Sequence, residues 1–219
     1  MVRERYTRQI SSLREDLLRL GSMVEQALLR AIDSLNTWDS TAAAQIINDD
    51  VQIDDAWRAL EERTIHLLAT QQPIVASDLR LITVVTAIAG ELERIGDYAN
   101  SIARRVRRAT RRPSFVTPPT SIKEMATLTV QMVNTSLEAF LRQDSALAHS
   151  LTQSDERVDE LEDLLRAEII TLAKSDPEKI EAAIDMLDVI HALERSADRA
   201  TNIGERVIFL ATNSVETLN

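Results

Sequence analysis

The chain has 219 residues, no cysteine and a formal net charge of −10. This length allows one domain or two small ones. The lack of cysteine excludes disulfides, thiolate metal sites and cysteine nucleophiles. The negative net charge argues against nucleic-acid binding. Residues 1–10 carry no apolar signal region, and no run reaches the roughly 18 consecutive apolar residues of a membrane span. We therefore expect a cytoplasmic protein with no direct membrane insertion.

Apolar residues recurring every three or four positions predict long amphipathic helices in the first half of the chain. The first covers about 7–36, and the second begins with N-cap candidates at 39–41 and runs to about 70. The third covers about 74–111. The QQP sequence at 71–73 separates the second from the third, because proline ends one helix and is accepted in the first turn of the next.

Three of the five prolines fall in RRPSFVTPPT at 111–120, which predicts a linker. After it the helical pattern starts again, with a proline break in the matching place. We interpret this as a tandem duplication of a three-helix unit. The predicted organisation is a first repeat at 1–112, a linker at 113–120 and a second repeat at 121–219. The predicted fold is all-α, with two elongated three-helix bundles placed in line.

Acidic pairs recur in register with this duplication. The sequence LERIGD at 92–97 returns as LERSAD at 193–198, and each copy holds two carboxylates four residues apart. On a helix this spacing places like charges one turn apart, where they repel by roughly 0.2–0.5 kcal/mol per pair. The second helix of each repeat adds another such pair. The candidate metal ligands are Glu93, Asp97, Glu194, Asp198, Asp50, Asp54, Asp155 and Asp159.

Carboxylate oxygens are hard ligands that suit iron, manganese, magnesium or calcium. Asp50 and Asp155 occupy apolar stripe positions, where a carboxylate is costly to bury unless something pairs with it. Glu93 and Asp97 project off the stripe, which places the predicted site at the surface or rim of the bundle. A solvated acidic face neutralised by neighbouring arginines remains the alternative.

Three segments resemble the PhoU family, the regulatory proteins associated with bacterial phosphate transport. LERIGDYANSIA at 92–103 and LERSADRATNIGE at 193–205 look like its signature helices, and DLRLI at 78–82 is similar to the segment that opens the first of them. The resemblance covers the whole chain. It departs in the second copy, where Ala197 replaces Gly96.

The resemblance implies two three-helix bundles, no catalytic residues and a multinuclear metal cluster, with iron or zinc as the first choice and manganese or magnesium as alternatives. The metal motif falls on Glu93 with Asp97 and on Glu194 with Asp198. The implied partners are the phosphate transporter ATPase subunit and a sensor histidine kinase, whose signalling the family restrains. We also expect a homodimer.

An arginine-rich segment ends the third predicted helix. Its arginines either complement the helix macrodipole or form a partner-binding patch for an acidic surface or a phosphate-bearing ligand. His191 is interpreted as a helix-packing residue. Two other functions stay open: a metal-free helical adaptor, and a ferritin-like metalloenzyme, although the Glu-x-x-His motif of the latter is absent. The segment's arginines are Arg104, Arg105, Arg107, Arg108, Arg111 and Arg112.

Overall fold

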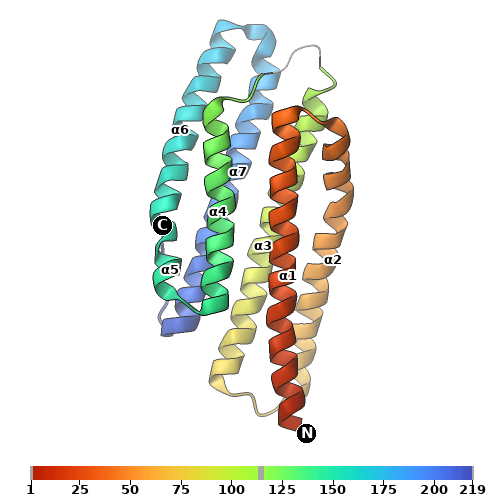
Figure 1. Ribbon diagram of the computed structural model, residues 1–219, viewed down its shortest axis with the longest axis vertical. Helices are drawn as coiled ribbons and strands as arrows, with labels where there is room; N and C mark the ends of the chain where they lie inside the picture. The colour runs from red at the N-terminus through yellow and green to blue at the C-terminus, as the bar shows by residue number, and fades with distance from the viewer. Residues whose placement is uncertain (1, 113–115, 219) are drawn as a thin grey trace.

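A computed structural model describes residues 2–112 and 116–218 of the chain. They form seven α-helices and one short 3-10 helix, and no strand, which confirms the all-α fold class (Figure 1). Residues 113–115 of the predicted linker lie outside the described residues. The elements are α1 (Val2–Thr37), α2 (Ser40–Thr70), α3 (Ala76–Ala109), α4 (Thr120–Arg142), α5 (Ser145–His149), α6 (Leu151–Ser175), η1 (Pro177–Lys179) and α7 (Ile180–Thr212).

The predicted helix boundaries in the first repeat follow from local capping. Asp39 is the N-cap of α2, and its side chain accepts hydrogen bonds from the backbone N–H groups of Thr41 at 2.8 Å and Ala42 at 3.0 Å. These bonds satisfy donors that the first turn of a helix leaves unpaired. After Pro73 the backbone stays extended through Val75, so α3 begins two residues later than predicted.

The second repeat departs from the three-helix pattern at one point. The helix that corresponds to α2 is divided into the short α5 and the longer α6, which meet at Ser150. Asp144 caps α5 by accepting a hydrogen bond from the Leu147 backbone N–H at 3.0 Å. No glycine or proline marks the division, so the sequence pattern does not reveal it.

The two bundles pack side by side, and the predicted in-line placement is wrong. Helix α3 lies against α7 and α1 lies against α4, while α2 and α6 cover the outer sides (Figure 1). Helix α3 can pack in two directions because it buries residues on more than one face, including Val84, Ala89 and Ala103 beside Leu81, Val85 and Leu92. The small alanines allow the helices to approach closely. The two repeats therefore share one interface along their length.

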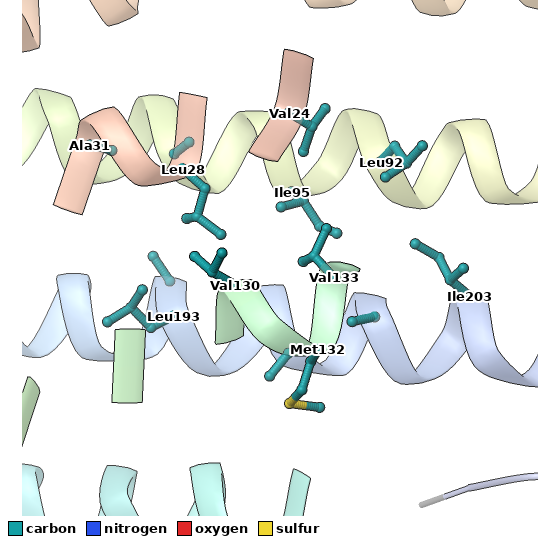
Figure 2. Close-up of a cluster of buried hydrophobic side chains, with 14 of the residues drawn as sticks. Val24, Leu28, Ala31, Leu92, Ile95, Val130, Met132, Val133, Leu193 and Ile203 are labelled. Atoms are coloured by element: carbon teal, nitrogen blue, oxygen red, sulfur yellow. The ribbon is translucent and has the colours of Figure 1, made fainter. Parts of the chain in front are cut away.

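The apolar core is continuous across that interface. In Figure 2, Leu28 of α1 and Ile95 of α3 point toward Val130 and Val133 of α4, and all four residues are buried. Burying one such side chain contributes roughly 1.5–3 kcal/mol. Burial of apolar side chains between the repeats therefore stabilises the fold.

Polar contacts follow the same α3–α7 interface. Arg199 of α7 donates to Glu91 of α3 at 3.2 Å, and Asn202 donates to the same carboxylate at 3.4 Å.

In the described part of the chain, none of the helices is both long and apolar enough to cross a membrane.

Candidate metal centres

The first acidic cluster consists of Asp50 and Asp54 of α2 with Glu93 and Asp97 of α3. Helices α2 and α3 approach closely here because residue 96 is glycine. A Cβ atom at Gly96 would lie 3.2 Å from Cγ2 of Ile53, which leaves little room for any side chain. The predicted pairs of this repeat therefore face one another across two adjacent helices.

Burial and mutual repulsion together raise the pKa values of carboxylates in the first cluster. Burial raises the pKa of Asp50, and the charges of Asp54 and Asp97 raise it further. Burial likewise raises the pKa of Glu93, with the charges of Asp97, Asp54 and Asp50 adding to the effect. Asp97 follows the same rule, since burial and the charge of Asp54 raise its pKa. Carboxylates from both helices thus act on one another electrostatically, as a shared cation site requires.

Neighbouring groups compensate part of this charge. The Asn100 side chain donates a hydrogen bond to Asp50. Arg58 pairs with Asp54 at 3.0 Å, and Arg94 lies 3.8 Å from Glu93. The alternative of an acidic face neutralised by arginines therefore fits the rim of this cluster.

The second acidic cluster is assembled by α6 and α7 and is more deeply buried. It contains the predicted Asp155 and Asp159 of α6 and the predicted Glu194 and Asp198 of α7. Asp155 is only 8% exposed, and its Oδ1 atom has no hydrogen-bond partner among the described residues. The Glu194 side chain is 16% exposed, and its Oε2 atom also lacks a hydrogen-bond donor there. Buried carboxylate oxygens without partners are costly, so a solvated acidic face does not describe this cluster.

Two further groups join the second cluster. Nδ1 of His191 lies 3.3 Å from Oε2 of Glu194 and 4.0 Å from Oε1 of Glu162. One ligand atom from each of these three residues lies within 4.8 Å of the others, a spacing at which a single ion can contact all three. The His191 side chain is 60% exposed, so the interpretation as a packing residue is wrong.

Glu162 is not among the ligands predicted from the sequence. Its signal was present, since Glu162 follows Asp159 by three residues and therefore lies on the same face of α6. Arg166 pairs with it at 3.2 Å. Its position beside His191 depends on how α6 is rotated against α7, which the spacing along one helix does not specify.

Burial and like charge raise the pKa values of the second cluster strongly. Burial raises the pKa of Glu194 from 4.5 to about 7, and the charges of Asp198 and Glu162 add to the rise. Burial also raises the pKa of Asp155 from 3.8 to about 6, with Asp159 and Asp198 contributing. The pKa of Asp159 rises for the same reasons, burial first and the charge of Asp198 second.

The two clusters offer different donor atoms and therefore suit different metal ions. The first offers carboxylate oxygens alone, which suit hard cations. The second adds an imidazole nitrogen, a donor that suits zinc and iron. Its unpartnered oxygens on Asp155 and Glu194 are where a cation would compensate the burial. Arg195 lies 2.6 Å from Asp198 and leaves those two oxygens unpaired.

The arginine-rich segment at the end of α3 forms ion pairs with α7. Arg105 pairs with Asp188 of α7 at 2.9 Å. Arg108 and Arg112 both pair with Asp185 of α7, at 3.2 Å and 2.7 Å. The segment therefore helps to join the two repeats, and its role as a partner-binding patch stays a prediction.

Comparisons with known proteins match the whole chain. The sequence model of the PhoU domain family matches residues 17–106 and again residues 122–207. A phosphate-specific transport system accessory protein PhoU homolog of Clostridium acetobutylicum is 33% identical over 219 residues, which is 100% of both chains. The phosphate-specific transport system accessory protein PhoU of Escherichia coli is 30% identical over 207 residues, covering 93% of this chain and 84% of that protein.

Solved structures agree with the sequence relatives. The crystal structure of PhoU from Pseudomonas aeruginosa superposes with a TM-score of 0.90 at 32% identity and covers 95% of this chain and 100% of that one. The crystal structure of the phosphate transport system regulatory protein PhoU from Streptococcus pneumoniae gives a TM-score of 0.88 at 31% identity, with coverages of 96% and 99%. As its signature helices indicate, the chain belongs to the PhoU family.

Proposed function

We propose that this chain is a metal-binding accessory protein of a phosphate transport system that regulates phosphate uptake and the phosphate-starvation response. The observation that carries this proposal is the full-length similarity to proteins named phosphate-specific transport system accessory proteins. Membership of the family also confirms the prediction of a non-enzymatic protein, because the relatives are named as accessory and regulatory proteins.

The second acidic cluster supports the metal-binding part of the proposal. Asp155 buries an oxygen that no described residue satisfies, and the buried Oε2 of Glu194 accepts no hydrogen bond although the exposed His191 ring lies 3.3 Å away. A cation would offset both the desolvation and the mutual repulsion. In this proposal Glu162, His191 and Glu194 hold one ion of an iron or zinc cluster, and the first acidic cluster holds hard cations such as iron, manganese or magnesium. The bound metal supplies charge compensation and no chemical step.

We further propose that the chain works in the cytoplasm as a homodimer that contacts the transporter ATPase subunit and restrains a sensor histidine kinase. The outer helices support a surface-binding role, because they expose large apolar side chains. Val51 and Ile65 of α2 are exposed, as are Leu164 and Ile170 of α6. Exposed apolar residues on two long outer helices are suitable for contact with partner proteins.

A reporter assay tests the regulatory function. In a deletion strain grown in high phosphate, we expect a phosphate-starvation promoter to be active and the intact chain to silence it again. A chain with Glu194→Gln and Asp198→Asn should fail to silence the promoter at equal abundance. Glu168→Gln with Asp33→Asn provides the matched control, because both of these residues are exposed. A deletion strain that keeps the promoter silent in high phosphate contradicts the proposal.

Affinity purification tests the proposed partners. The intact chain should retain the transporter ATPase and the sensor kinase from phosphate-replete cells, and light scattering should give twice the mass of one chain. If both partners are retained but the purified protein cannot be loaded with any metal, the metal-free adaptor replaces the metal-binding regulator.

A further inference from the structure

A hollow of about 420 Å³ opens at the C-terminal end of α3. Ile47 of α2 forms one wall, and arginine side chains form the rest: Arg104, Arg107 and Arg108 of α3, with Arg111 and Arg112 just after its end. We call it the arginine hollow. It concentrates positive charge on a chain whose net charge is −10.

Intramolecular carboxylates account for only part of that charge. Asp185 is 4% exposed and engages Arg108 and Arg112. Arg104 donates from Nε to the Asn100 side chain at 2.9 Å and forms no salt bridge with a described carboxylate, although its charge partly offsets the rise in the pKa values of Asp50 and Asp97. Within 2–112 and 116–218, no ion pair involves Arg107 or Arg111. The hollow therefore presents the guanidinium groups of Arg107 and Arg111 without a paired carboxylate from the described part of the chain.

The helix end adds no attraction for an anion. The hollow lies at the C-terminal end of α3, where the macrodipole is negative, so arginines there stabilise the helix. However, one or two basic residues in the last turn achieve that effect, and it does not require five arginines around one concavity. An anion held here must be bound by the guanidinium groups themselves.

The lining indicates the chemistry of the ligand. Planar guanidinium groups bind phosphate oxygens through paired hydrogen bonds. Several of them around one hollow suit a ligand with several adjacent negative charges. Among the described residues no aromatic side chain lines the hollow, so none of them would stack on a nucleotide base. A chain of linked phosphates satisfies each of these conditions.

We propose that the arginine hollow binds a phosphoanhydride chain, supplied either as inorganic polyphosphate or as the triphosphate tail of a nucleotide. Arg107 and Arg111 provide the unneutralised contacts, and Arg104 extends the site toward α3. Arg104 touches the first acidic cluster through Asn100, but Arg107 and Arg111, the residues that the test replaces, belong to neither cluster. Failure of this site would therefore leave the metal-binding proposal unchanged.

Titration calorimetry with inorganic tripolyphosphate tests the site. The full-length chain is measured in metal-free buffer, because phosphate chains chelate metal ions. We expect one tripolyphosphate per chain, and binding about 100-fold weaker when Arg107→Glu and Arg111→Glu are combined, since each removes a charge-assisted contact worth about tenfold or more. Arg107→Lys with Arg111→Lys keeps the charge but not the paired geometry and should give an intermediate loss.

The matched control combines Arg5→Glu with Arg206→Glu, two exposed arginines outside the hollow with the same change in charge. At an ionic strength of about 0.15 M it should bind within about threefold of the unmodified chain, because the Debye length is then about 8 Å and distant exposed charges are largely screened. Circular dichroism verifies that every variant is folded. Equal weakening in the control, or no heat with the unmodified chain, overturns the proposal.

Measurements with citrate and ATP test whether the site requires phosphate and which kind of molecule supplies the phosphate chain. Citrate carries similar charge without phosphate, and binding as tight as that of tripolyphosphate overturns the phosphate assignment. ATP competing with tripolyphosphate at about equal affinity supports a site that reads the phosphate chain alone. A tenfold preference for ATP assigns the source to nucleotides, and the opposite preference assigns it to inorganic polyphosphate.

Discussion

Replacing Glu194 by Gln should stabilise the metal-free protein at alkaline pH. In the folded chain this carboxylate is buried beside Asp198, Glu162 and Asp159, and its pKa is raised from 4.5 to about 7. Above pH 7 the folded state must hold it ionised among like charges. Glutamine has nearly the same shape and no charge, so the substitution removes the repulsion.

The sign and size of the effect follow from linkage. A raised folded-state pKa favours the folded state below the unfolded pKa of 4.5, and this contribution is lost as pH rises toward 7. At 1.36 kcal/mol per pKa unit, the whole change corresponds to about 3 kcal/mol. Solvent reaches part of the carboxylate and screens its charge, so we expect about 1–3 kcal/mol.

Urea unfolding followed by circular dichroism measures the difference. At pH 8 the Glu194→Gln variant of the metal-free protein should be more stable than the unmodified chain, and by pH 4.5 the gap should close. Glu168→Gln on exposed α6 surface should change little at either pH. A Glu194→Gln variant that is equally or less stable than the unmodified chain at pH 8 would refute the reasoning.

Three other predictions address the second cluster, the core and the interface between the repeats. His191→Ala should weaken metal binding at the second cluster on the order of tenfold in competition with a chromophoric chelator, and unchanged affinity would remove His191 from the site. Ile95→Ala should cost about 2–5 kcal/mol in urea unfolding, against less than about 0.5 kcal/mol for exposed Leu141→Ala, and a similar cost for both would contradict the shared core. Asp185→Asn should cost about 1.5–3 kcal/mol and speed hydrogen exchange at the start of α7, and unaltered exchange would show that its arginine pairs do not hold the repeats together.

The sequence predicted most of the fold because its signals are local. The Asp39 cap, the break at Pro73 and the apolar stripes each depend on residues a few positions apart. The duplication was visible for the same reason, because both repeats keep the same spacing of acidic pairs and of the proline break. The side-by-side packing was missed because it depends on a second buried face of α3, where alanines such as Ala89 and Ala103 carry a weak apolar signal.

The acidic pairs were predicted from the sequence, but the difference in burial and hydrogen bonding between the two clusters was not. Each pair is a spacing on one helix, whereas the second cluster also depends on how α6 and α7 face one another. That relation places Glu162 beside His191 and buries Asp155 without a donor. The first cluster has Asn100 and Arg58 where the second has unpartnered oxygens.

Metal content per chain tests the central claim most directly. The intact protein and three variants are loaded with iron or zinc, freed of loose metal and measured by elemental analysis. Glu93→Gln with Asp97→Asn should lose the metal of the first repeat alone, and Glu194→Gln with Asp198→Asn should lose that of the second. The variant that combines all four changes should retain no metal. If it retains as much metal as the intact chain, or if the intact chain binds none, the two acidic clusters are not metal sites.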